Sequence, residues 1–210
     1  MHILLTDFLT CPRCGPEFGL ILLADQLRDR RIDAGELGCA NCRNAYPIRR
    51  GAADLRVPGS APLPATDAFG SDPERVFRAA ALLGVTRPNT TVLVVEAGGT
   101  AVRGIAEILS EVHVVGASAR ADGEEDSAGV ISAVLTGERI PLRDHSVAAV
   151  ALLGSWSPTL AVEAARVLSG GGRLVVDPAP AGAAEALRET GFDIQLEQEG
   201  VVVAAAPGPA

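Results

Sequence analysis

The sequence predicts an α/β fold in which a small N-terminal module precedes a doubly wound, mostly parallel sheet with an antiparallel last strand. Two C-x-x-C pairs near the N-terminus mark the small module. After residue 90, short β-rich runs alternate with helical ones. The strands are apolar without clean alternation, which indicates a parallel sheet covered by helices. Glu199-Gly200 supplies a turn between the last two runs, so the final strand is expected to return antiparallel.

The domain boundary is predicted at residues 58–70, PGSAPLPATDAFG. This segment has three prolines among small and polar residues, which is typical of an extended connection. A chain of 210 residues suffices for one ordinary domain and one small one. We therefore expect a first domain at 1–57, a linker at 58–70 and a second domain at 71–210.

The elements of the second domain follow from capping signals and apolar runs. Ser71, three residues before Glu74, is expected to cap a helix that runs to Leu83 and stops at Gly84. The other helices are expected near 101–110, 158–168 and 181–190, and the strands at 90–96, 112–116, 130–135, 146–153, 172–177, 192–199 and 201–206. This order is that of a doubly wound sheet.

The charge balance limits the classes of partner. A net charge of -8 disfavours broad contact with nucleic acid, which requires clustered cations. Within the first 57 residues there is one basic cluster, formed by Arg28, Arg30, Arg31, Arg43, Arg49, Arg50 and Arg56. It leaves RNA or an acidic protein as a partner through that module alone, and the alternative interpretation is a solvated face.

The sequence also bears on location. No apolar run approaches the roughly 18 residues typical of a membrane span, and the N-terminus lacks the pattern of a secretory signal. We expect a cytoplasmic protein without a membrane partner.

The two C-x-x-C pairs predict a metal site. Cys11 and Cys14 are separated by 24 residues from Cys39 and Cys42. Each pair suits a tight knuckle, and four thiolates complete a tetrahedral zinc shell with no open position, so the zinc would be structural. A module this small buries little apolar surface, so metal binding would stabilise its fold directly. The alternatives are four packed free cysteines or a redox pair, and iron is the less favoured metal.

The first module also resembles a known family over residues 2–57. The phrases HILLTDFLTCPRC, GELGCANC and NAYPIRRGAADL are similar to the zinc-ribbon subunit that activates tRNA, ribosomal RNA and release-factor methyltransferases. The step Tyr46-Pro47-Ile48 is the most specific part of the match. In that family the ribbon docks on a class I methyltransferase and stabilises it, so the resemblance implies that the two domains of this chain pack together.

The second domain resembles a class I S-adenosylmethionine-dependent methyltransferase. The phrases EAARVLSGGGRLVVDPAP (163–180) and ERIPLRDHSVAAVALL (138–153) carry the resemblance. The family binds its cofactor with an acid followed by Gly-x-Gly-x-Gly, and this sequence offers Glu96, Gly98 and Gly99 in a loop that is one residue short and ends in Ala101. If S-adenosylmethionine is bound, the resemblance assigns Glu96, Gly98, Gly99 and Ser118 to it.

Two further cofactor contacts of the family are missing. Ala117 or Ser118 stands where the family places the carboxylate that accepts both ribose hydroxyls, and a serine cannot give a charge-assisted pair. Thr136 stands where an acid contacts the adenine. The segment DGEEDSAG (122–129) is a poor helix interior, so the helix expected there is stunted or missing.

No catalytic residue is assigned. Ala148 or Ala149 replaces the family's acid on the fourth strand, and LLGSWSP lacks an amide-methylating motif and a reactive cysteine. We therefore expect a noncatalytic methyltransferase-like protein that binds zinc, does not retain S-adenosylmethionine, and acts as a structural or regulatory subunit in a protein assembly. The alternative is an active S-adenosylmethionine-dependent methyltransferase acting on RNA, protein or a small metabolite.

Overall fold

The structure is a computed structural model that describes residues 1–64, 69, 72–96, 100–119 and 130–208. The helical segments are η1 (Ile3–Asp7), α1 (Pro73–Leu83), α2 (Thr100–Ile108), α3 (Pro158–Val167) and α4 (Ala183–Glu189). The strands are β1 (Thr10–Cys11), β2 (Gly15–Gly19), β3 (Ile21–Arg28), β4 (Arg31–Gly38), β5 (Ala45–Arg49), β6 (Ala52–Asp54), β7 (Thr91–Glu96), β8 (His113–Ser118), β9 (Val130–Leu135), β10 (Val147–Leu153), β11 (Leu168–Asp177), β12 (Asp193–Gln198) and β13 (Val201–Ala205).

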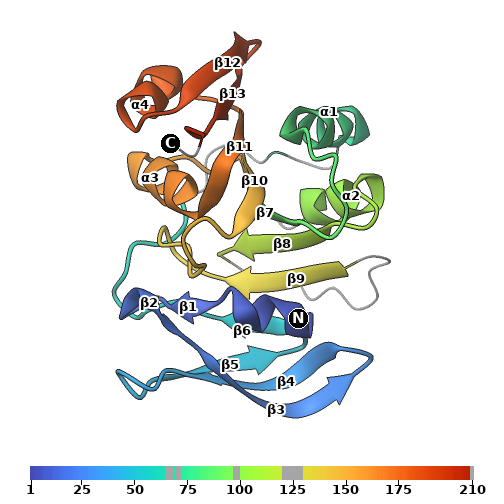
Figure 1. Ribbon diagram of the computed structural model, residues 1–210, viewed down its shortest axis with the longest axis vertical. Coiled ribbons are helices and arrows are strands. Elements are labelled where there is room, and N and C mark those ends of the chain that lie inside the picture. Colours follow the sequence, from blue (N-terminus) through green and yellow to red (C-terminus); the bar gives the residue numbers. More distant parts are fainter. Residues whose placement is uncertain (65–68, 70–71, 97–99, 120–129, 209–210) are drawn as a thin grey trace.

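A single 11-stranded sheet runs through the molecule in the order β12-β13-β11-β10-β7-β8-β9-β6-β5-β4-β3 (Figure 1). Strands β7 to β11 are parallel to one another, and β13 lies antiparallel between β11 and β12. The predicted α/β class and the antiparallel last strand are therefore confirmed.

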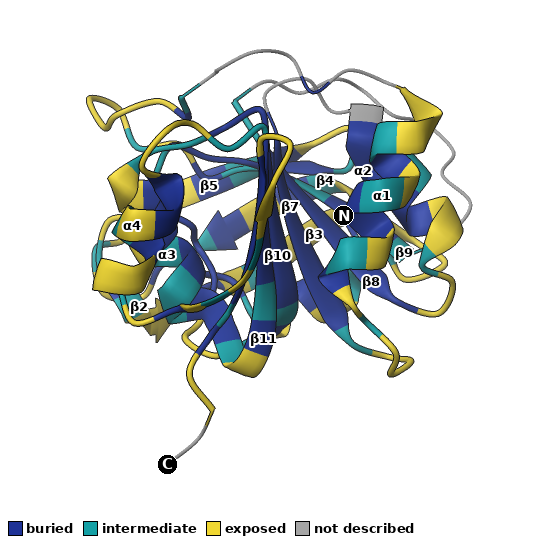
Figure 2. Ribbon diagram, turned by 90° about the horizontal axis from the view of Figure 1, so that it is seen from above, coloured by how far each residue is buried: buried dark blue, intermediate teal, exposed yellow. Residues whose placement is uncertain are grey.

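Helices cover both faces of the parallel strands. Figure 2 shows α1 and α2 on one face and α3 and α4 on the other, so β7 and β10 are buried along nearly their whole length. Burial on both faces explains why these strands are apolar without alternation. The Asp72 side chain caps α1 by accepting from the Glu74 amide, directly before Pro73 in the first turn; Ser71, the predicted cap, lies outside the described residues.

The cysteine-containing module joins the sheet through a parallel strand pair. In β6, Ala52, Ala53 and Asp54 pair with residues 133–135 of β9, and β5 then continues antiparallel on the far side of β6. The two parts of the chain therefore share one backbone ladder, and a single apolar cluster continues from the module into the α3 side of the sheet.

A second contact between the parts is made by the loop after β9. The Thr10 amide donates to the Pro141 carbonyl at 2.9 Å, and the Arg143 amide donates to the Phe8 carbonyl at 2.9 Å. Leu9 and Leu142, both buried, form an isolated bridge between these segments. The module is thus fixed by β6 and by the segment around β1.

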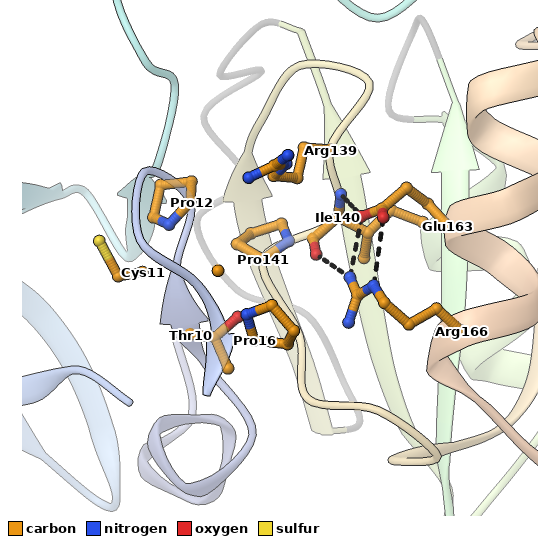
Figure 3. Close-up of a pocket in the computed structure, with 10 residues that line it drawn as sticks. Thr10, Cys11, Pro12, Pro16, Arg139, Ile140, Pro141, Glu163 and Arg166 are labelled. Atoms are coloured by element: carbon orange, nitrogen blue, oxygen red, sulfur yellow. Dashed lines mark hydrogen bonds and ion pairs between the residues drawn. The ribbon is translucent and has the colours of Figure 1, made fainter. Parts of the chain in front are cut away.

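Arg166 of α3 holds this loop in place (Figure 3). Its guanidinium donates to both carboxylate oxygens of Glu163, to Asp144, and to the carbonyls of Ile140 and Leu142, at 2.7 to 3.1 Å. Glu163 in turn accepts the Ile140 amide at 2.8 Å. A bidentate, partly buried guanidinium is well suited to fixing a loop by its backbone carbonyls.

His113 is buried at the start of β8, where its Nε2 lies 2.8 Å from the Ser132 hydroxyl. Burial, with the nearby charges of His2 and the N-terminal amine, lowers the pKa of His113 to about 4. In an unfolded chain the pKa of histidine is about 6.5. Between these values the unfolded chain binds the additional proton, so the free energy of unfolding falls as the pH falls from 6.5 to 4.

We expect the variant His113→Gln to lose less stability in acid than the natural chain. When the pH is lowered from 7 to 4.5, titration of His113 reduces the free energy of unfolding of the natural chain by about 2 kcal/mol. Glutamine does not titrate, so the variant does not have this loss. Urea unfolding at both pH values measures the difference. Acid protonation of the cysteines affects both proteins equally and cancels in the comparison. Identical losses in the two proteins would contradict the assignment.

Candidate metal centre and cofactor edge

The four cysteines of the N-terminal module converge on one point. Cys11 ends β1 and Cys14 lies on the turn between β1 and β2, whereas Cys39 and Cys42 lie on the turn after β4. The Sγ atoms of Cys11 and Cys42 are 3.7 Å apart, those of Cys14 and Cys39 are 3.8 Å apart, and all four lie within 4.8 Å of one another.

The spacing of the sulfurs fits a tetrahedral metal ion. Zinc–sulfur bonds of about 2.3 Å place the sulfurs of a regular tetrahedron about 3.8 Å apart. A disulfide requires roughly 2.05 Å, which no described pair approaches. The four cysteines are therefore spaced as in a zinc ribbon and could hold one tetrahedral zinc ion.

The turns that carry these cysteines are tight. The Arg43 amide donates to the Cys39 carbonyl at 2.9 Å, and the Cys39 amide donates to the Asn44 carbonyl at 2.9 Å. Arg43 itself has a positive φ of 61°, a conformation that closes the turn after the second pair. The backbone thus presents both sulfurs of the pair toward the same side.

Two neighbouring side chains support the sulfurs, and the cysteine spacing did not indicate either. The Tyr46 hydroxyl lies 3.4 Å from Cys11 Sγ, and the Asn41 amide nitrogen donates to Cys14 Sγ at 3.3 Å. Burial raises the pKa of the Cys11 thiol, but hydrogen bonds from Tyr46 and from the backbone of the first turn outweigh it and lower the pKa to about 7. A thiol with such a pKa is readily deprotonated for a metal.

At the carboxyl ends of the central strands, the structure places the predicted cofactor contacts with a mixed result. Glu96 ends β7, is 2% exposed, and its carboxylate accepts the Ala101 amide in the first turn of α2 at 3.0 and 3.2 Å. Gly98 and Gly99 lie outside the described residues. Glu96 therefore caps the N-terminus of α2.

The ends of β8 and β9 carry hydroxyl side chains. Ser118 is the last residue of β8, and its carbonyl accepts the Thr136 amide at 3.0 Å. The Thr136 hydroxyl is buried and donates to the Arg139 carbonyl at 2.7 Å. Asp122 and the predicted stunted helix lie outside the described residues.

Two buried polar groups at this edge had no signal in the sequence. Ser155, just after β10, is 1% exposed, and its hydroxyl has no hydrogen-bond partner among the described residues. Asp177, at the end of β11, is 3% exposed and pairs with Arg75 at 2.6 Å and Arg78 at 3.0 Å. These ion pairs fix α1 beside the carboxyl ends of the strands. Trp156 packs against the apolar core.

Comparison with known proteins agrees with this geometry. Residues 2–51 match the family model described as Trm112p-like protein. A search of curated proteins gives no match. The first part of the chain is therefore a Trm112-like zinc ribbon, and it is followed by a methyltransferase-like domain.

Solved structures establish the fold of that domain. A protein from Methanococcus maripaludis assigned to the S-adenosyl-L-methionine-dependent methyltransferases has a TM-score of 0.51 at 16% identity, over 66% of this chain and 85% of its own. The 1,6-didemethyltoxoflavin-N1-methyltransferase of Burkholderia thailandensis, solved with 1,6-didemethyltoxoflavin and S-adenosylhomocysteine, also has a TM-score of 0.51 at 16% identity, over 63% and 78%. A complex containing the Haloferax volcanii Trm112 methyltransferase activator matches at 16% identity, over 62% and 88%, with a TM-score of 0.48.

The predicted combination of a zinc ribbon with a class I methyltransferase fold is thus confirmed. Among the described residues, no helix is long and apolar enough to cross a membrane. The assignments of individual residues to zinc and to S-adenosylmethionine remain predictions, as does the cytoplasmic location.

Proposed function

We propose that this chain is a noncatalytic methyltransferase-like protein, stabilised by a built-in zinc ribbon, that acts as a structural or regulatory subunit of a protein assembly. The observation that carries the proposal is Ser118 at the end of β8. The resemblance places there the carboxylate that holds the cofactor ribose. Cys11, Cys14, Cys39 and Cys42 are the proposed zinc ligands, and residues 1–57 and 71–210 the proposed domains, with 58–70 as their connection.

Two further observations support the proposed loss of cofactor binding. The Thr136 hydroxyl, at the proposed adenine position, donates its hydrogen to the chain's own Arg139 carbonyl. On β10, Ala149 is fully buried and Ala148 is half-buried, so neither side chain supplies an acid to the cofactor edge. Both observations support the proposal that the domain has lost polar contacts by which the family binds S-adenosylmethionine.

The proposed partner is a protein. The ribbon's β6 is already paired with β9 of the same chain, so this edge of the ribbon serves its own domain. Other surfaces must therefore recognise a separate subunit. Nucleic acid is the alternative partner, and it would bind only through the arginines of the zinc module.

The second candidate function is an active S-adenosylmethionine-dependent methyltransferase, and Ser155 favours it. Its buried hydroxyl, which has no hydrogen-bond partner among the described residues, follows β10 directly and lies at the edge where α/β sheets bind ligands. Asp122, outside the described residues, could serve as the ribose acid in that case.

A designed gain of binding separates the two functions. A carboxylate on the ribose hydroxyls contributes roughly 1.5 to 3 kcal/mol for each charge-assisted bond. We therefore expect Ser118→Asp to tighten S-adenosylmethionine binding by about tenfold or more. Ala119→Asp, which adds the same charge one residue further on, is the matched control and should change little. Micromolar binding by the natural chain, lost in Asp122→Asn, would instead support the active enzyme.

A further inference from the structure

A cleft lies where the zinc ribbon meets the methyltransferase-like domain. Its volume is about 290 Å³, and it is lined by Pro12, Arg13, Leu55, Val57, Ser60, Thr136, Gly137 and Arg139. Leu55 to Ser60 follow β6, and Thr136 to Arg139 follow β9. The cleft therefore lies at the carboxyl ends of the parallel pair β6–β9, with the first cysteine turn as its third wall.

The chain diverges at these two strand ends. After β6 it leads to α1, whose apolar side chains belong to the core on the α1–α2 face. After β9 it leads through Ile140 and Leu142, which belong to the core on the α3–α4 face. Open α/β sheets form ligand-binding crevices where the segments that follow two neighbouring strands lead to opposite faces of the sheet. The ribbon thus creates a second such crevice, separate from the one at β7 and β10.

Among the described residues, both charged side chains that line the cleft are positive. Arg13 and Arg139 are exposed, and within the described part of the chain neither guanidinium makes a hydrogen bond or an ion pair. Among the residues that the structure describes, no acidic residue lines the cleft, although the whole chain has 26 Asp and Glu residues and a net charge of -8. Figure 3 shows the Arg139 side chain extending toward Pro12 of the first cysteine turn. Nearby Arg56, by contrast, is neutralised by Asp54.

We propose that this cleft binds a small organic oxyanion, a phosphate monoester or a carboxylate. Guanidinium groups recognise both anions through paired hydrogen bonds. The apolar walls of Pro12, Leu55 and Val57 suit the organic part of the ligand. The hydroxyl hydrogens of Ser60 and Thr136 are donated to backbone carbonyls, so their oxygens are left to accept hydrogen bonds from ligand hydroxyls.

Binding at this cleft is expected to depend on the metal, because Arg13 lies between Cys11 and Cys14, two of the proposed zinc ligands. The proposal does not require S-adenosylmethionine binding, because Arg13 and Arg139 are not among the proposed cofactor contacts; among the described lining residues, only Thr136 is also placed at the adenine position by the resemblance.

The test is calorimetric titration of the zinc-loaded full chain with glycerol 3-phosphate and, separately, with citrate. The double variant Arg13→Gln/Arg139→Gln should weaken the affinity at least about tenfold, since it removes the charge-assisted bonds. The matched control Arg143→Gln removes an exposed arginine of the same loop that does not line the cleft, and should leave the affinity within about twofold. Zinc content is measured in every variant.

The two ligands decide which anion the cleft selects, and saturable binding of either one supports the site. The proposal is overturned if neither ligand binds below about 10 mM, if the double variant binds as well as the natural chain while retaining zinc, or if only a long RNA binds.

Discussion

Replacing Cys39 with serine is expected to release the metal and unfold the zinc ribbon. Cys39 is 4% exposed, and its sulfur lies 3.8 Å from that of Cys14 at one edge of the proposed tetrahedron. Structural zinc contributes an apparent 10 to 16 kcal/mol in small ribbons, roughly the whole stability of a domain. A hydroxyl cannot replace the thiolate, so the ribbon loses its main source of stability.

The loss should spread to the neighbouring sheet. Without a folded β6, strand β9 becomes an open sheet edge, and the apolar cluster shared by the two domains loses its ribbon half. We therefore expect rapid hydrogen exchange throughout residues 1–57 and faster exchange in β9, with slow exchange kept in β7 and β10. Asn41→Ala, which removes only the donor to Cys14, should retain the metal. A Cys39→Ser protein that keeps one zinc per chain would contradict the assignment.

The second large effect is expected from Ala53→Asp. Ala53 is fully buried in β6, between Ile48 of β5 and Val134 of β9. An aspartate there places an unpaired carboxylate in an apolar interior, which costs about 4 kcal/mol or more. Because the zinc ligands lie elsewhere in the ribbon, the metal should remain bound while β6 separates from β9.

Separation of the domains is visible in solution. NMR relaxation should give a single rotational correlation time for the natural chain and different times for the two domains of Ala53→Asp. The matched control is Ala45→Asp, the same substitution at an exposed position of β5. If Ala53→Asp still tumbles as one body at full stability, the β6–β9 pairing does not hold the domains together.

The sequence located most regular elements because their signals are local. The run VISAVL was placed at 130–135, the range of β9, and the other predicted strands of the second domain overlap those observed. β11 begins earlier than expected, at Leu168, because its pairing with β10 starts before the register shift between Val147 and Ala149. That shift arises from tertiary pairing, which apolar periodicity does not report.

The connections between distant segments could not be predicted. β6 is only three residues of small and polar type, and its partner β9 lies about eighty residues further along the chain, so no pattern within Ala52–Asp54 indicates a central strand. The ion pairs of Arg75 and Arg78 with Asp177 likewise join α1 to β11 across the domain. The packing of the two parts could be predicted from the resemblance to a docking subunit, but not from the residue pattern alone.

The candidate sites divide in the same way. The four cysteines were found because C-x-x-C spacing reports a short-range turn geometry. Tyr46 and Asn41 contact the sulfurs through the fold, so their roles had to come from the structure. At the cofactor edge, Ser118 was identified by counting from a strand, whereas the buried Ser155 hydroxyl carries no sequence signal.

The most direct test of the central claim is a calorimetric titration of the zinc-loaded natural chain with S-adenosylmethionine. A noncatalytic domain that has lost the ribose carboxylate should show no saturable heat up to about 1 mM, since the missing bonds weaken binding by a factor of about ten to several hundred. The zinc content of the sample is measured as a control, and a value close to one per chain would confirm that the protein is folded. A dissociation constant in the micromolar range would contradict the account and establish cofactor binding.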